Sequence, residues 1–205
     1  MKEIKNNCYK GTRILLGNEK RDLVNKMIAE LKEQGFQEIQ VPIIQQSSVF
    51  FGKVGEENSH RMYKLTDKGG RDLCLAPEYT AVIQQLAQTY FKNDKDVKLF
   101  YVAECFRGDN PQLGRWRQFT QLGVEILNPT RDWSITLTAL AGDLLNYNTN
   151  DFELILNNIR GLDYYKDFTF EIQHRKSGLS VCGGGAYEGG IGFAIGLDRL
   201  MKLSE

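Results

Sequence analysis

FRGDNPQLGRWRQFTQLGVE, Phe106 to Glu125, is the stretch of this 205-residue chain that decides how its fold and chemistry are interpreted. Its pattern predicts the end of one strand, a polar loop from Arg107 to Gly114, and a second strand from Arg115 to Leu127. Alternation along the second strand places six side chains on one face: Arg115, Arg117, Phe119, Gln121, Gly123 and Glu125. Taken alone, such a face is typical of the solvated side of an amphipathic strand.

The loop favours a different interpretation of that face. Arg107 ends the preceding strand, Val97 to Phe106, so the turn brings more guanidinium charge over the same side chains. A polyphosphate is well matched by fork-shaped cationic donors of this kind. Gly123 has no side chain and would let an adenine ring or a backbone approach closely. Together these features predict a polyphosphate site.

The rest of the chain predicts helices and strands that alternate irregularly. Helices are expected from Asn18 to Gly35, from Pro77 with Val82, Leu86 and Tyr90 as its buried stripe, and from about Arg131 to Leu145. Further strands are expected at Phe36 to Pro42, His60 to Thr66, Arg71 to Leu75, Phe152 to Leu156, and in a hairpin across Phe168 to Cys182. Because hairpins join many of these strands, we expect an α+β fold with a mainly antiparallel sheet flanked by helices.

Composition limits the classes of protein to consider. With 41% hydrophobic and 25% charged residues, the chain fits one domain spanning residues 1–205. The net charge of zero gives no support by itself for nucleic-acid binding. No apolar segment has the length of a signal or membrane span, so we expect a cytoplasmic protein.

Cysteine and histidine usage gives no metal-thiolate pattern. The four cysteines are scattered without a CxxC pair, and only His60 and His174 could join them as ligands. Cys74, Cys105 and Cys182 stand among apolar residues, which indicates reduced cysteines in a core.

Phe106 to Glu125 closely resembles motif 2 of the class II aminoacyl-tRNA synthetases, in its histidyl-tRNA synthetase version, within a motif 2 region of about 97–127. The resemblance implies the class II catalytic-domain fold. It also implies that Arg107 holds the α-phosphate of ATP and the amino-acid carboxylate, while Arg115 reaches the outer phosphates. Gln121 and Glu125 are implied to line the amino-acid pocket.

Two further segments resemble the same family. RGLDYY, residues 160–165, is similar to its histidine-specific segment, although two tyrosines after a turn more often only pack. The resemblance implies that Arg160 acts on the α-phosphate and that Tyr165 contacts the imidazole. GFAIGLDRL, within motif 3 at about 192–203, implies that Arg199 clamps the γ-phosphate and faces the adenine. The pair Asp198 and Arg199 would otherwise be a weak surface ion pair.

LAPEYT, Leu75 to Thr80, resembles the family's LRPExT, which implies that Glu78 and Thr80 receive the α-ammonium group of histidine. The alternative for Glu78 is a favourable charge at a helix start. GGGAYEGG, residues 183–190, resembles the family's GGGRYDG, which implies that Tyr187 is a tyrosine of the histidine pocket. Lys10 to Arg13 and the region at about 19–42 resemble the family's KGTRD opening and motif 1, and this resemblance implies a homodimer.

The resemblance implies ATP-dependent activation of histidine as its adenylate, followed by transfer to tRNA or an acceptor-stem RNA. Mg²⁺ is expected with ATP, without an all-protein metal site. Only about thirty residues separate Glu125 from Arg160, where the family carries an insertion domain, and no anticodon-binding domain follows motif 3. Two alternatives stay open: a histidine-binding regulatory paralogue, such as an ATP phosphoribosyltransferase regulatory subunit, and an amino-acid ligase with a non-tRNA acceptor.

Overall fold

One large sheet organises the chain. The structure is a computed structural model that describes residues 2–4, 8–146, 150–157 and 165–203. Within these residues, seven strands follow the order β3-β7-β8-β12-β11-β10-β9. Their bounds are Gln37–Glu38 (β3), Val97–Phe106 (β7), Gln118–Leu127 (β8), Gly190–Gly196 (β12), Leu179–Tyr187 (β11), Tyr165–His174 (β10) and Phe152–Leu156 (β9). β3 pairs with β7 in parallel, and the other pairs are antiparallel. The predicted α+β class is confirmed.

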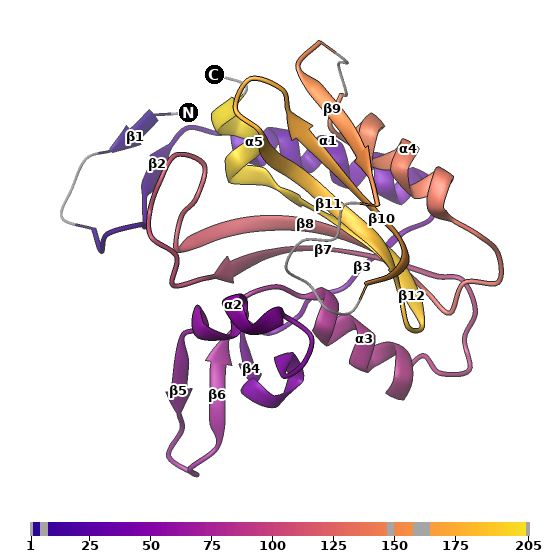
Figure 1. Cartoon of the computed structure of the whole chain (residues 1–205), viewed down its shortest axis with the longest axis horizontal. Coiled ribbons are helices and arrows are strands. Elements are labelled where there is room, and N and C mark those ends of the chain that lie inside the picture. Colours follow the sequence, from indigo (N-terminus) through magenta and orange to yellow (C-terminus); the bar gives the residue numbers. More distant parts are fainter. Residues whose placement is uncertain (1, 5–7, 147–149, 158–164, 204–205) are drawn as a thin grey trace.

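Helices cover one face of this sheet, as Figure 1 shows. They are α1 (Glu19–Glu33), α4 (Ser134–Leu144) and α5 (Leu197–Leu203). Alternate residues of β8, namely Leu122, Val124 and Ile126, join Met27 of α1 and Leu137 of α4 in one hydrophobic cluster. Burial of each such side chain contributes roughly 1.5–3 kcal/mol. The apolar side of the strand therefore holds the helices, and its polar side is left for other contacts.

A smaller group of elements packs below the β7 edge of the sheet in Figure 1. It contains a three-stranded sheet of β4 (Ile44–Gln46), β6 (Asp72–Leu75) and β5 (Lys64–Thr66), with the 3-10 helix η1 (Ser47–Phe50), α2 (Gly55–His60) and α3 (Thr80–Thr89). Phe50 and Ile83 join Leu99 and Tyr101 of β7 in a second hydrophobic cluster. The N-terminal strands β1 (Lys2–Ile4) and β2 (Ile14–Leu16) pair with each other. The second hydrophobic cluster holds α3 beside the polar side of the large sheet.

Three local predictions were wrong. The strand expected from His60 begins only at Lys64, because His60 is the last residue of α2. The strand expected from Phe36 to Pro42 contains only Gln37 and Glu38. Tyr90, expected in the buried stripe of α3, is 78% exposed.

The error at Tyr90 follows from where α3 ends. The buried residues of the helix lie between Thr80 and Ala87. The helix ends at Thr89, so Tyr90 is the C-cap residue and lies beyond the buried turns.

The buried cysteines were predicted correctly, since Cys74, Cys105 and Cys182 are buried and unbridged. None of the helices in the described part of the chain has the length and apolar character that a membrane-spanning helix requires.

Candidate active site

A pocket lies over the sheet face opposite α1 and α4. Its lining comes from the β7–β8 loop, β8, β10, β11, β12, the start of α3 and α5. Phe119 and Gln121 reach it from β8, in alternation with the core residues Leu122 and Val124. The predicted polar face of β8 is therefore part of the pocket wall rather than a solvated surface.

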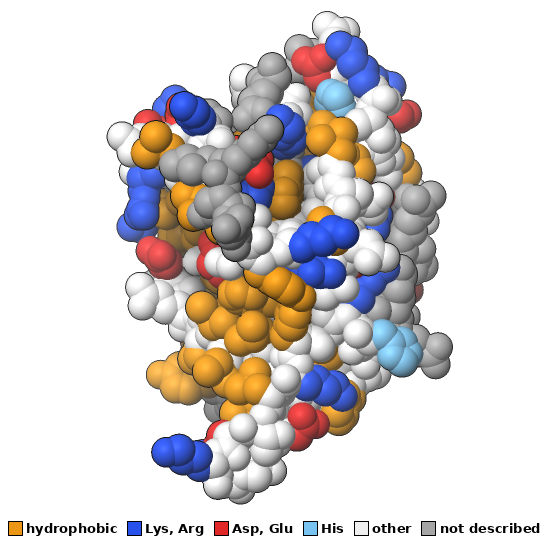
Figure 2. All heavy atoms as spheres, turned by 90° about the vertical axis from the view of Figure 1, so that its left-hand side faces the viewer, with side chains coloured by type: hydrophobic (Ala, Val, Ile, Leu, Met, Phe, Trp, Pro, Cys, Tyr) orange, Lys and Arg blue, Asp and Glu red, His pale blue; other side chains and the backbone are white. Residues whose placement is uncertain are grey.

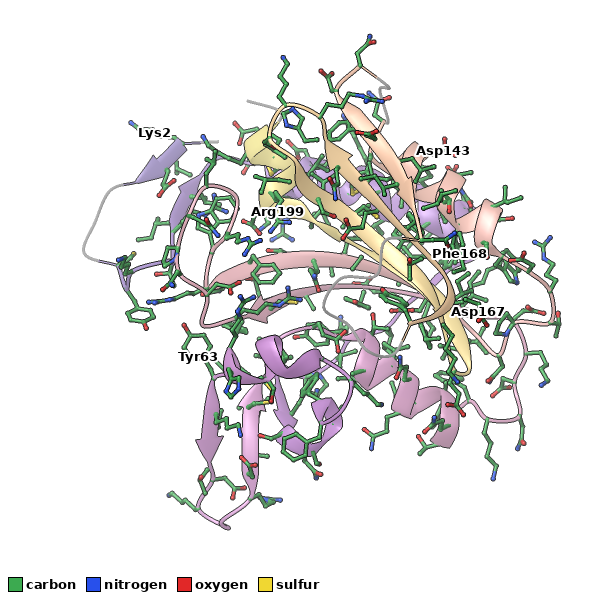
Figure 3. All side chains as sticks on the ribbon, in the orientation of Figure 1. Lys2, Tyr63, Asp143, Asp167, Phe168 and Arg199 are labelled. Atoms are coloured by element: carbon green, nitrogen blue, oxygen red, sulfur yellow. The ribbon has the colours of Figure 1, made fainter. Side chains whose placement is uncertain are left out.

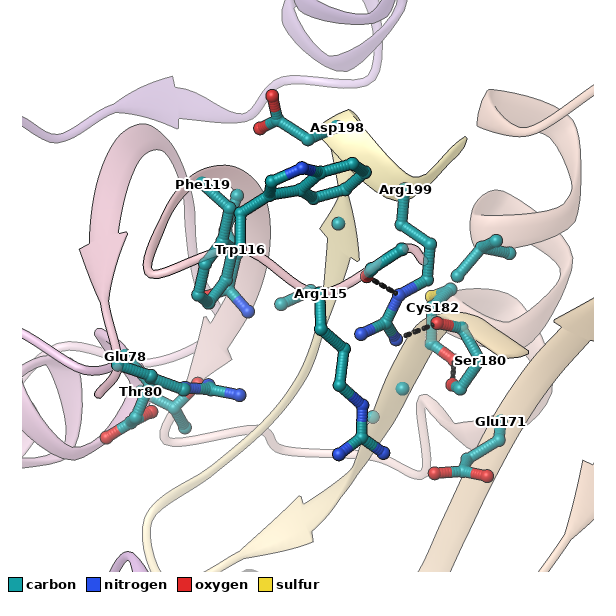
Figure 4. A pocket seen from close by; sticks show the side chains of 18 of the residues that line it. Glu78, Thr80, Arg115, Trp116, Phe119, Glu171, Ser180, Cys182, Asp198 and Arg199 are labelled. Carbon is teal, nitrogen blue, oxygen red and sulfur yellow. Dashed lines mark hydrogen bonds between the residues drawn. The ribbon is translucent and has the colours of Figure 1, made fainter. Parts of the chain in front are cut away.

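Three arginines line this pocket: Arg107, Arg115 and Arg199. The Nε of Arg199 donates to the Gly114 carbonyl at 2.8 Å, and its Nη1 donates to the Ser180 carbonyl. Figure 3 shows Arg199 below α5, and Figure 4 shows its two hydrogen bonds. The Nε of Arg107 donates to the Pro77 carbonyl at 2.8 Å. Backbone oxygens thus orient two of the guanidinium groups before any anion binds.

The arginine cluster is electrostatically poised for an anion. Burial, together with repulsion from Arg115 and Arg107, lowers the pKa of Arg199 to about 10. Arg199 still carries its charge at neutral pH. An anion bound among the three groups relieves this repulsion, and preorganised donors of this kind suit charge that develops on a phosphoryl group.

β8 begins only at Gln118, after a turn from Gln112 to Arg115, so the predicted place of Arg115 to Arg117 in this strand was wrong. Gln112 and Arg115 exchange backbone hydrogen bonds, and Gly114 has φ +71°, which favours glycine. Arg115 lines the pocket together with Trp116, which alternation had placed on the opposite face. Arg117 turns away, and its guanidinium donates to the carbonyls of Asp109 and Lys10. A turn obeys no two-residue period, which is why alternation failed here.

A buried polar cluster lies beside the pocket around Glu125, which is 0% exposed. Its Oε1 accepts from the Thr80 hydroxyl at 2.8 Å, and its Oε2 accepts from the Tyr187 hydroxyl at 2.7 Å. Burial raises the pKa of Glu125 to about 8, although the two hydroxyl groups oppose this shift. The carboxyl group is consequently largely protonated at pH 7.

Glycine opposite Glu125 makes the cluster possible. Gly192 of β12 faces Glu125 in the ladder, and a Cβ at Gly192 would lie 1.9 Å from the carboxylate Oε2. No larger residue fits without moving the carboxyl group. Glu125 itself lies behind the side chains that line the pocket, whereas Thr80 lines it directly.

Glu78, Gln121 and Tyr165 were all predicted from sequence, and all line the pocket. Glu78 is 5% exposed, and its Oε1 accepts from the Ala81 amide at 3.0 Å. It therefore occupies the helix-start position of the simpler interpretation and also faces the pocket. The Oε1 of Gln121 accepts from the Cys105 thiol at 3.1 Å. Tyr165 stands opposite Tyr187 in the β10–β11 ladder.

Arg160, with most of the predicted segment 160–165, lies outside the described residues.

Sequence reasoning missed Tyr101 and misjudged Gly123. The Tyr101 ring lies against Gly123, its ladder partner, so closely that a Cβ there would be 2.0 Å from Cζ. The expectation that an adenine approaches Gly123 was wrong, because this tyrosine occupies the space. The signal that could have revealed it was the register, which places a large residue on β7 directly opposite a glycine on β8.

Asp198 is not the surface partner of Arg199 that the alternative interpretation describes. It is 6% exposed, and its carboxylate accepts from Arg13 at 2.5 Å and from the Thr120 amide at 2.6 Å. Asp198 therefore ties α5 to β8 and to the N-terminal segment.

Comparison with known proteins identifies the family. The family model described as histidyl-tRNA synthetase matches residues 17–132, more than half of the chain. The chain belongs to the histidyl-tRNA synthetase family. The histidine--tRNA ligase of Methanospirillum hungatei is 39% identical over 122 residues, which are 58% of this chain but only 30% of that enzyme.

A second family member matches nearly the whole chain. The histidine--tRNA ligase of Methanocaldococcus jannaschii is 27% identical over 308 aligned positions, covering 94% of this chain and 74% of that enzyme. Because the alignment is longer than the 205 residues of the chain, this histidyl-tRNA synthetase relative carries residues that have no counterpart here.

Solved structures confirm the class II synthetase catalytic-domain fold. The S. aureus histidyl-tRNA synthetase is similar with a TM-score of 0.75 and 24% identity, over 97% of this chain and 70% of that chain. A Bacillus halodurans protein described as an ATP phosphoribosyltransferase regulatory subunit/histidyl-tRNA synthetase gives a TM-score of 0.78 at 16% identity, over 98% of this chain and 85% of that one. At these identities the histidyl-tRNA synthetase likeness concerns the fold alone.

Proposed function

We propose that this chain uses ATP to activate histidine as histidyl-adenylate and passes the histidyl group to tRNA or an acceptor-stem RNA. The observation that carries the proposal is the convergence of Arg107, Arg115 and Arg199 in one pocket that Glu78 and Thr80 also line. Cationic groups and a carboxylate in the same pocket match a polyphosphate and an α-ammonium group. Membership of the histidyl-tRNA synthetase family supports the choice of substrate.

In the proposed reaction, a carboxylate oxygen of histidine attacks the α-phosphorus of ATP, and pyrophosphate leaves. No covalent bond to the protein forms, so the side chains act by positioning and by stabilising negative charge. Arg107 would hold the α-phosphate together with the attacking carboxylate, while Arg115 and Arg199 hold the outer phosphates. The action of Arg160 on the α-phosphate belongs to the same proposal.

Mg²⁺ would enter as part of the ATP complex. The described residues contain no group of three His, Cys, Asp or Glu side chains placed to hold an ion. Of the pocket carboxylates, Asp198 is bound by Arg13 and Asp109 by Arg61, at 2.5 and 2.9 Å. Mg²⁺ keeps several waters and binds readily through substrate phosphates, so ATP phosphate oxygens and water would supply most of its ligands here.

Selection of histidine would rest on the polar cluster around Glu125. Glu78 and Thr80 would receive the α-ammonium group, with Gln121 beside them. Tyr165 on the pocket wall, Tyr187 and the buried Glu125 would distinguish the imidazole from other rings. A site built from buried polar groups rejects an analogue that lacks their partner by about 10⁴ or more. Phenylalanine would therefore fail as a substrate.

We also propose that the chain forms a homodimer in the cytoplasm. Exposed apolar side chains near motif 1 support the dimer: Ile43 is 42% exposed, Ile44 53% and Phe51 55%. Figure 2 shows hydrophobic side chains gathered on one face of the molecule. Sedimentation equilibrium is expected to give about twice the 23.4 kDa chain mass, and a concentration-independent monomer would contradict this.

The experiment that tests the proposed function is amino-acid-dependent exchange of labelled pyrophosphate into ATP, run with each of the twenty amino acids. We expect exchange with histidine alone, because adenylation is reversible and independent of RNA. No exchange with any amino acid, from folded protein that binds histidine, would favour the regulatory paralogue. Exchange without acylation of tRNA or a minihelix would favour a ligase with another acceptor.

A further inference from the structure

The N-terminal segment Tyr9 to Arg13 packs against the β7–β8 loop. The Arg117 amide donates to the Gly11 carbonyl at 2.8 Å, and the Arg117 guanidinium donates to the Lys10 carbonyl at 2.9 Å. Gly11 has φ +89°, and a Cβ there would lie 2.8 Å from Pro111 of the loop. This part of the chain is therefore closely fitted to the loop that carries pocket residues.

Arg13 is held between two residues of the pocket. Its Cζ lies 3.5 Å from the centroid of the Trp116 ring, and its Nη2 is 2.5 Å from the Asp198 Oδ1. The Arg13 side chain is only 10% exposed and that of Asp198 5%, so water screens these contacts little. Figure 4 shows the Trp116 indole next to Asp198 on one side of the pocket. The stack and the ion pair together define the orientation of Trp116.

Contacts hold the residues on both sides of Arg115, whereas the Arg115 guanidinium is not held by them. Gly114 is bound by Arg199 through its carbonyl, and Trp116 is covered by Arg13. Within the described part of the chain, no hydrogen bond or ion pair is made by the Arg115 guanidinium, which Figure 4 shows extending into the pocket. A fixed backbone with an unpaired cationic head is what a preorganised phosphate contact requires.

We infer that Arg13 is a positioning residue: by stacking on Trp116 it holds the neighbouring Arg115 where the outer phosphates of ATP bind. The inference rests on the proposed function for the identity of the anion. Arg13 touches neither substrate, and its effect passes through Trp116. Lys20 offers a matched comparison, because its Nζ also pairs with Asp198, at 3.2 Å, and no contact with Trp116 accompanies it.

Fluorescence tests the positioning independently of activity. In a Trp133→Phe background, Trp116 is the only tryptophan of the chain. Arg13→Lys keeps the positive charge for Asp198 but loses the planar face that stacks on the indole. We expect iodide to quench Trp116 more strongly in Arg13→Lys, and quenching in Lys20→Met to equal that of the parent. Equal quenching in all three proteins would overturn the inference.

Kinetics test the consequence for ATP. In pyrophosphate exchange, Arg13→Lys is expected to raise the KM for ATP by roughly ten- to hundredfold, with the KM for histidine changed less than about twofold. A mere loss of folded protein would lower kcat and leave both KM values alone. Equal increases in both KM values would contradict a role confined to Arg115. If the parent shows no exchange, the proposed function fails, and the quenching result still decides whether Arg13 orients Trp116.

Discussion

Arg107→Ala is expected to lower the kcat/KM of histidine-dependent pyrophosphate exchange by roughly 10²- to 10³-fold, the cost of removing one preorganised charge-stabilising donor. Arg107 directly follows β7, and the Pro77 carbonyl accepts from its Nε at 2.8 Å. Its guanidinium also lies 5.1 Å from the Phe119 ring, so the head group is held in one orientation facing the pocket. The α-phosphate carries the charge that changes during the reaction, and for this reason the loss should appear mainly in kcat.

Two variants show whether that loss is specific. Arg107→Lys keeps the positive charge but lacks the planar, fork-shaped guanidinium, so it should recover only part of the activity that Arg107→Ala loses. Arg131→Ala removes a guanidinium that stacks on Trp133, 3.9 Å from its centroid, and that does not line the pocket. It should exchange pyrophosphate like the parent. An Arg107→Ala enzyme within about tenfold of the parent would remove Arg107 from the proposed mechanism.

Glu125→Gln is expected to make the protein gain stability relative to the parent as pH rises from about 4.5 to 8. In the parent, burial raises the pKa of Glu125 to about 8 from the ordinary value of 4.5. Between these values the folded protein holds a proton that the unfolded chain has lost, so the free energy of unfolding falls as pH increases. Glutamine has no such proton. The variant should gain by roughly 2–5 kcal/mol across this range, with the difference constant above it.

Urea unfolding of both proteins at several pH values measures this difference, since titrations common to both cancel. Glu188→Gln is the matched control, because the Glu188 side chain is 77% exposed and pairs only with Lys166 at the surface. The difference in free energy of unfolding between Glu188→Gln and the parent should not change with pH. A flat difference for Glu125→Gln as well would mean that the carboxyl group is ionised in the folded protein and that the two hydroxyl groups outweigh its burial.

Local pattern and motif spacing were sufficient for most of the fold. The strand from Val97 to Phe106 was predicted with its correct bounds, as was Phe152 to Leu156. These strands have strong apolar content and clear ends, so local preference and tertiary packing agree. Motif resemblance likewise selected Glu78, Thr80 and Gln121, which the structure brings to one pocket. Their shared pocket depends on the packing of α3 against β8, which local pattern alone does not specify.

By itself, then, the sequence determined the α+β class, the family, and which arginines and carboxylates belong near one another. Only the tertiary structure decided how those groups are held. Tyr101 fills the space at Gly123 because the two residues are ladder partners, and Asp198 turns inward to Arg13, 185 positions away in the chain. Glu125 acquires a pKa near 8 because packing removes it from water. Each of these properties depends on contacts between distant segments, and a periodic pattern in the sequence carries information only about near neighbours.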